Sequence, residues 1–200
     1  MRALILAGGN GTRLMMGEKP LVTIGGKPMI GYVIDALRDA GCEVWVVVSG
    51  KTPYTQNWCR AHGIAYFHAS GAGYIEDISE TVWELGETLP FITAVSDIPC
   101  ITSGIITDVL ERYNASDKDA CSTWVPQSLC MRHGCRTGYS MVVDGELSCP
   151  AGLNILRGDV IDREQEELQI LIKDVRLAFN INTREELATV RDYLAMRSRD

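Results

Sequence analysis

The chain has 200 residues, of which 46% are hydrophobic and 22% are charged, and its net charge is -7. This length and composition predict a single globular domain, residues 1–200, with a sizeable core. An acidic chain lacks the broad basic surface that neutralises the phosphates of DNA or RNA, so we expect no nucleic-acid partner. The first apolar segment, residues 3–7, is too short for a signal sequence or a membrane span, and the seven cysteines are scattered without a CxxC pair. We therefore expect a cytoplasmic protein with reduced thiols.

Short apolar runs rich in β-branched residues alternate with amphipathic segments along the chain. The apolar runs predict strands at residues 3–7, 43–48, 64–67, 91–95 and 120–125. The amphipathic segments predict helices at about residues 28–40, 74–87 and 103–113. This alternation is typical of right-handed βαβ units, so we expect an α/β fold with a three-layer αβα, Rossmann-like architecture and a mainly parallel sheet.

The pattern changes in the C-terminal third. Residues 139–156 have the pattern of a hairpin around an Asp144-Gly145 turn, which predicts a small antiparallel addition to the sheet. Thr183 and Glu186 have the spacing of a capping box, so a last helix is expected to begin there. Residues 180–182 are then expected at the end of a strand, directly before that helix.

A glycine-rich segment, Gly8-Gly9-Asn10-Gly11-Thr12-Arg13, directly follows the first predicted strand. In an open α/β sheet the carboxyl ends of the strands border the ligand crevice, and glycines allow backbone N–H groups to converge on phosphate oxygens. Arg13 and Lys19 add full positive charges, which favours a triphosphate over a dinucleotide. A tight strand-to-helix turn is the alternative for the glycines alone. The chain contains no P-loop motif, which argues against a kinase of that class.

Asp97 follows the predicted strand at residues 91–95, and so it is expected at the same edge of the sheet. One carboxylate, together with substrate phosphates and water, is enough to hold Mg²⁺. The alternative is that Asp97 caps a helix or forms a turn before Pro99.

Two neighbouring segments, Leu6-Ala7-Gly8-Gly9-Asn10-Gly11-Thr12-Arg13 and Glu18-Lys19-Pro20-Leu21, resemble the signature of nucleotidyltransferases with a glycosyltransferase-A-like Rossmann sheet. Three further segments, at residues 70–77, 150–154 and 179–183, make almost the whole chain similar to the archaeal GTP:adenosylcobinamide-phosphate guanylyltransferase family. That family transfers GMP from GTP to adenosylcobinamide phosphate, giving adenosylcobinamide-GDP and pyrophosphate in cobalamin assembly. The resemblance implies GTP and a corrinoid phosphate as substrates, and the sequence leaves the oligomeric state open.

The resemblance also implies roles for individual residues. The catalytic residues would be Arg13, Lys19 and Asp97, with Lys19 reaching the α-phosphate. The nucleotide would be bound by Leu6, Ala7, Gly8, Gly9, Gly11, Thr12, Arg13, Lys19, Gly152, Asn180 and Asn182. The acceptor side would be formed by Tyr74, Glu76, Asp77 and Asn154. The alternative for Glu76 and Asp77 is stabilisation of a helix N-terminus.

The magnesium ligand implied by the resemblance is Asp97. Many members of the superfamily have a second aspartate where this chain has Asn180, and an amide supplies only a neutral oxygen. We therefore expect Mg²⁺ to arrive mainly with GTP.

Other functions fit parts of the pattern. A related guanylyltransferase would act on molybdopterin or phospholactate, and a non-catalytic nucleotide-binding module is compatible with the fold alone. An NAD-dependent dehydrogenase needs an acidic residue at the end of the second strand to bind the ribose. This chain has Val48-Ser49-Gly50-Lys51 there, which argues against that function.

Overall fold

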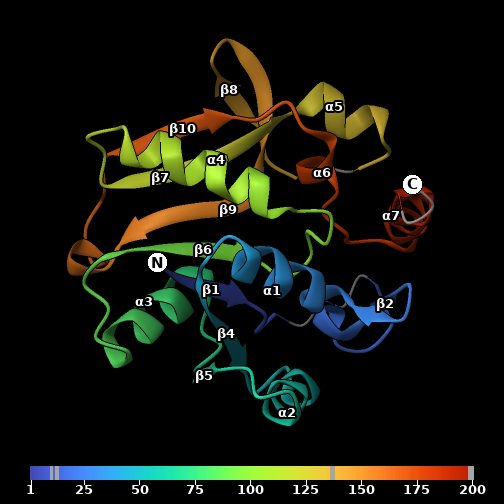
Figure 1. Cartoon of the computed structure of the whole chain (residues 1–200), viewed down its shortest axis with the longest axis horizontal. Helices are drawn as coiled ribbons and strands as arrows, with labels where there is room; N and C mark the ends of the chain where they lie inside the picture. The colour runs from blue at the N-terminus through green and yellow to red at the C-terminus, as the bar shows by residue number, and fades with distance from the viewer. Residues whose placement is uncertain (10, 12–13, 136–137, 198–200) are drawn as a thin grey trace.

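The computed structural model describes residues 1–9, 11, 14–135 and 138–197. Its centre is an eight-stranded sheet with the main order β10-β7-β9-β6-β1-β4-β5, and β8 pairs with β9 (Figure 1). The strands are β1 (Arg2–Leu6), β4 (Glu43–Ser49), β5 (Tyr66–Ala69), β6 (Pro90–Val95), β7 (Ala120–Pro126), β8 (Met141–Val143), β9 (Glu146–Arg157) and β10 (Glu167–Leu171). β9 runs antiparallel to its neighbours, whereas the other pairs along the main order are parallel. The predicted α/β fold with a mainly parallel sheet is confirmed.

Helices connect the strands and cover the sheet, and a small separate hairpin precedes the first of them. The helices are α1 (Met29–Asp39), α2 (Pro53–Ala61), α3 (Tyr74–Glu84), α4 (Ser103–Asn114), α5 (Gln127–Arg132), α6 (Val175–Ala178) and α7 (Arg184–Arg197), with 3-10 turns η1 (Lys19–Leu21) and η2 (Gly158–Val160). The hairpin consists of β2 (Thr23–Ile24) and β3 (Lys27–Pro28).

The sheet separates two hydrophobic cores because successive side chains of a strand point to opposite faces. Ile5 of β1 belongs to the larger core, which contains the buried residues of α1 and α4. Leu4 belongs to a smaller core, whose helical members, Ile78 and Val82, both come from α3. The expected three layers are present, and the layer on the α3 side is the thinner of the two.

Two elements differ from the prediction in the first half of the chain. β5 begins two residues later than expected, because Ile64 closes the end of α2, where its N–H donates to the Cys59 carbonyl at 2.9 Å. α2 itself was not predicted. Only Thr55 and Cys59 of this helix are buried, so the segment is too polar overall to stand out as a core-facing helix in the sequence.

The C-terminal third contains the expected hairpin, since β8 and β9 pair around the Asp144-Gly145 turn. β9 then continues between β6 and β7, so the antiparallel strand lies inside the sheet rather than at its edge. The prediction that residues 180–182 end a strand is wrong. This segment lies between α6 and α7, and the Ile181 N–H connects it to the Asp97 carbonyl at 3.0 Å.

All seven cysteines are buried free thiols. Burial raises the pKa of Cys121 to about 12 and that of Cys59 to about 11, which keeps these thiols protonated and poorly reactive. Within the described part of the chain, no helix combines the length and the apolar character needed to cross a bilayer.

The predicted capping box at the start of α7 is confirmed. The Glu186 N–H donates to Thr183 Oγ1 at 3.2 Å, and Glu186 Oε2 accepts from the N–H groups of Thr183 at 2.9 Å and Asn182 at 2.6 Å. Glu186 is only 2% exposed, so these are buried charge-assisted bonds. They fix the backbone of the 180–182 segment.

Replacing Glu186 by alanine leaves two partly buried N–H groups without their acceptor. We expect the E186A variant to lower the free energy of unfolding by about 2–4 kcal/mol, measured by urea denaturation followed by circular dichroism. The exposed neighbour Glu185 provides the control, and E185A should change stability by less than about 0.5 kcal/mol. Equal stabilities for the two variants would contradict a buried anchoring role.

Candidate functional site

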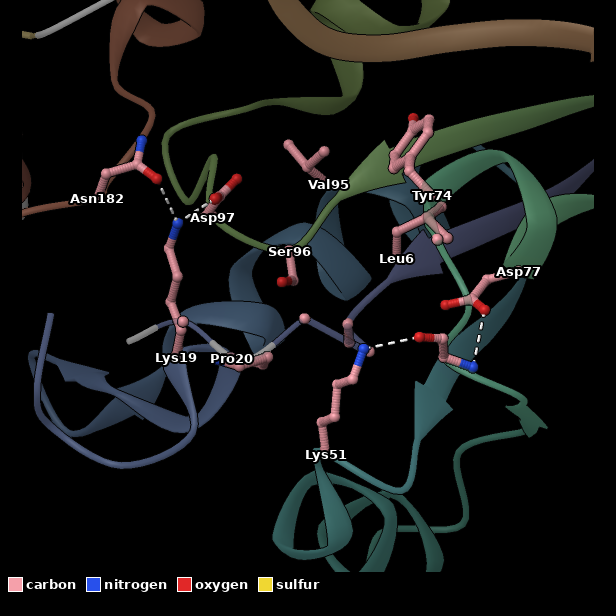
Figure 2. Close-up of a pocket in the computed structure, with 16 residues that line it drawn as sticks. Leu6, Lys19, Pro20, Lys51, Tyr74, Asp77, Val95, Ser96, Asp97 and Asn182 are labelled. Carbon is pink, nitrogen blue, oxygen red and sulfur yellow. Dashed lines mark hydrogen bonds and ion pairs between the residues drawn. The ribbon is translucent and has the colours of Figure 1, made fainter. Parts of the chain in front are cut away.

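The carboxyl ends of β1, β4 and β6 border a cavity of about 420 Å³ (Figure 2). The structure brings together in its lining eight of the residues proposed from the sequence for phosphate and metal contacts: Leu6, Ala7, Gly8, Gly9, Gly11, Lys19, Asp97 and Asn182. Two others, Thr12 and Arg13, lie outside the described residues.

The glycine-rich loop continues the line of β1 into this cavity. The Ala7 N–H donates to the Val47 carbonyl at 2.8 Å, and the Gly8 carbonyl accepts from Ser49 Oγ at 2.8 Å, which ties the start of the loop to β4. Gly11 has a φ of 53°, and a Cβ placed on it would stand 2.6 Å from Lys19 Cβ. Only glycine allows the loop to lie this close to the lysine.

Lys19 joins three segments that are far apart in the sequence. Its ammonium group forms an ion pair with the Asp97 carboxylate and donates to Asn182 Oδ1 at 3.0 Å. The Asn182 amide in turn donates to Asn180 Oδ1 at 2.8 Å. The side chains of Lys19 and Asp97 are only 12% and 15% exposed, so this cation and anion are largely shielded from water.

Glu18 explains how Lys19 is held in place. Its carboxylate accepts from the N–H groups of Tyr54 at 2.8 Å and Thr55 at 2.6 Å, and from the Thr55 hydroxyl at 2.6 Å. These N–H groups belong to the first turn of α2, where the helix dipole favours a negative charge. The residue before Lys19 is thus anchored to a rigid helix.

Asp97 occupies the turn that follows β6. One of its oxygens, Oδ1, is buried and has no hydrogen-bond partner among the described residues. An unsatisfied buried carboxylate oxygen is costly, which suits a position that meets a cation or a donor of a ligand.

The opposite end of the cavity is built around Gly71. Lys51 Nζ donates to the Gly71 carbonyl at 2.6 Å, and the Gly71 N–H donates to Asp77 Oδ1 at 2.9 Å (Figure 2). Gly71 has a φ of 73°. Lys51 was not among the residues proposed from the sequence, although it follows β4 and the rule that ligands meet strand ends would have found it.

A second cavity of about 810 Å³ lies beside the first, over β7, β9 and α3. Tyr74 lines both cavities, and Asn154 lines the second. Burial raises the pKa of Tyr74, whereas its interactions with the Thr93 and Asn154 side chains lower it.

The remaining residues proposed from the sequence lie around the two cavities. Asp77 lines the first cavity, with the residues expected to bind nucleotide, and Glu76 is exposed and lines neither. Asn180 does not line the first cavity, but it accepts a hydrogen bond from Asn182, which does. Gly152, with a φ of 78°, packs behind Val95, and a Cβ there would stand 2.4 Å from Val95 Cγ2.

A protein of known sequence resembles this chain over most of its length. Adenosylcobinamide-phosphate guanylyltransferase from Methanocaldococcus jannaschii is 29% identical over 198 residues, which cover 94% of each chain.

Solved structures share the fold at lower identity. HddC from Yersinia pseudotuberculosis, in complex with GMP-PN, has a TM-score of 0.72 at 17% identity and covers 96% of this chain and 99% of its own. CMP:2-keto-3-deoxy-manno-octonic acid synthetase with CTP has a TM-score of 0.74 at 17% identity and covers 98% of both chains.

The model of the MobA-like NTP transferase domain matches residues 3–143, which include the glycine-rich loop, Lys19, Lys51, Asp77 and Asp97. The chain belongs to the family of MobA-like NTP transferase domains.

Proposed function

We propose that the protein transfers GMP from GTP to adenosylcobinamide phosphate and releases pyrophosphate. The observation that carries this proposal is the similarity to the M. jannaschii guanylyltransferase over 94% of each chain. The match to the NTP transferase domain ends at residue 143. The similarity to the guanylyltransferase also includes most of the chain beyond that residue. The buried thiols suit a reducing compartment such as the cytoplasm.

The residues that line the first cavity support a nucleoside triphosphate as its ligand. The glycine-rich loop and Lys19 line one end, where backbone N–H groups and an ammonium group favour phosphates. Lys19 is already positioned by Asp97 and Asn182, so its charge stabilises the negative charge that develops at the α-phosphate without rearrangement.

The second cavity supports a large acceptor that approaches from the side. Its walls include the apolar side chains of Ile75, Trp124 and Leu156, and polar groups of Tyr74 and Asn154 lie among them. An acceptor phosphate that passes Tyr74 reaches the first cavity, where one of its oxygens attacks the α-phosphorus and pyrophosphate leaves on the opposite side. That oxygen is already ionised near neutral pH, so no general base is needed.

A magnesium ion fits the donors at the Lys19 end. Asp97 offers a buried oxygen without a partner, and one carboxylate is enough when the triphosphate and water supply the other ligands. We propose that Asp97 would hold Mg²⁺ that arrives with GTP. The ion would there neutralise charge on the phosphate oxygens.

The substrates are tested by incubating the protein with adenosylcobinamide phosphate, Mg²⁺ and each of the four ribonucleoside triphosphates. We expect adenosylcobinamide-GDP and pyrophosphate with GTP, detected by mass spectrometry and a coupled pyrophosphate assay. Parallel reactions contain molybdopterin or phospholactate. Turnover of one of these acceptors, with none of adenosylcobinamide phosphate, would replace the proposal by a different guanylyltransferase.

Removing the charge of Lys19 should slow the chemical step. We expect K19M to lower kcat by about 100- to 1,000-fold, since one electrostatic contact to the reacting group is lost. The control is K27M, because Lys27 pairs with Asp35 at the protein surface and does not line the cavity. Equal kcat values for the K19M and K27M variants would remove Lys19 from the mechanism.

A substitution of Asn154 tests the second cavity separately from the first, because Asn154 lines only the second. We expect N154L to raise KM for the corrinoid substrate about tenfold through the loss of one polar contact, while the Kd for GTP stays within about twofold. Steady-state kinetics and calorimetry measure the two quantities. A rise in the Kd for GTP with an unchanged acceptor KM would place the acceptor elsewhere.

A further inference from the structure

The cavity end opposite Lys19 carries a cation and an anion that are held by the same residue. The Gly71 carbonyl accepts from Lys51 Nζ at 2.6 Å, and the Gly71 N–H donates to Asp77 Oδ1 at 2.9 Å. Figure 2 shows both side chains at this end, away from Lys19 and Asp97. Because the same glycine fixes both groups, their relative position does not depend on a bound ligand.

The position of these groups identifies the part of the ligand that they meet. If the triphosphate occupies the glycine-rich loop and Lys19, the nucleobase extends toward Gly71. Backbone of Gly8, Gly71 and Gly73 lines this end. Walls without side chains allow a planar ring to approach closely.

Asp77 has one oxygen available for this ring. The Gly71 N–H occupies Oδ1, whereas Oδ2 has no hydrogen-bond partner among the described residues. Oδ2 points toward the glycine-rich loop, since a Cβ placed on Gly8 would stand 3.5 Å from it. An ionised carboxylate only accepts hydrogen bonds, and an ammonium group only donates them.

Guanine carries the complementary pattern. Its N1–H and 2-amino groups are adjacent donors, and its O6 and N7 atoms are acceptors. Adenine has no 2-amino group and presents a donor at the position of O6. We propose that Asp77 selects guanine by accepting hydrogen bonds from N1–H and the 2-amino group, and that Lys51 donates to the O6 and N7 side. This inference rests on the proposed nucleotidyl transfer and assigns the residues that determine its nucleotide specificity.

Asp77 also has a structural role, because it lies in the first turn of α3 and bonds to Gly71. The D77N variant separates the two roles. In this variant the amide oxygen of Asn can still accept from the Gly71 N–H. The NH₂ group of the amide then points toward the nucleobase. An NH₂ group opposes the two donors of guanine but matches the 2-oxo group of xanthine.

The test is isothermal titration calorimetry of the full chain with GTP, ITP and XTP in the presence of Mg²⁺. ITP lacks the 2-amino group, so the wild-type protein should bind it about tenfold or more weakly than GTP. We expect D77N to bind GTP about 10- to 100-fold more weakly than the wild type, to lose the preference for GTP over ITP, and to prefer XTP. The K51M variant should bind GTP and ITP more weakly than the wild type by the same factor, because both nucleotides carry O6 and N7.

The control is E84Q, which removes a charge from an exposed position of the same helix and should leave all three affinities unchanged. Thermal unfolding verifies that D77N is folded, and the wild-type comparison of GTP with ITP needs no variant. Equal wild-type affinities for GTP and ITP, or a folded D77N variant that still prefers GTP, would overturn the assignment. The titrations contain no acceptor, so a protein that fails to use adenosylcobinamide phosphate still reports on Asp77.

Discussion

The ion pair between Lys19 and Asp97, extended by Asn182, is the interaction around which the nucleotide cavity is organised. It connects the 3-10 turn η1, the turn after β6 and the segment before α7. A shielded ammonium group is stable only if anions or hydrogen-bond acceptors surround it. A triphosphate, as proposed above, would add such groups at the open side of the cavity, so the arrangement suits an anionic ligand.

The second organising feature is β9, which runs antiparallel inside an otherwise mainly parallel sheet. It carries Asn154 and Leu156 to the face where α3 provides the helical part of a small core. The thin cover on this face leaves the second cavity open beside the first. Tyr74, at the start of α3, borders both, so one helix terminus stands between the two substrates of the proposed reaction.

Much of this organisation can be predicted from the sequence because it depends on local patterns. The strands around residues 91–95 and the glycine-rich loop follow from apolar runs and glycine spacing, and Thr183 with Glu186 identifies the start of α7. The remaining features depend on contacts between residues far apart in the sequence, which local patterns do not predict. The insertion of β9 into the sheet depends on long-range pairing. The 180–182 segment resembles a strand end, but bonds to Asp97 and Glu186 hold it in place of a strand neighbour.

The position of Lys51 after β4 indicates the ligand edge of the sheet, but not its contact with Gly71. A lysine after a strand is a common surface residue, and only the fold places it opposite Asp77 across Gly71. For the same reason, Asp77 was grouped with Tyr74 from its position in the chain, whereas the two side chains point in different directions from α3 (Figure 2).

The three bonds from Glu18 to the start of α2 have a mechanical consequence. α2 begins at Pro53, two residues after Lys51, and Glu18 immediately precedes Lys19. The first turn of α2 therefore contacts the segment of Lys19 and directly follows the segment of Lys51. The segments that carry Lys19 and Lys51 therefore share one support, which ties together the two ends of the cavity.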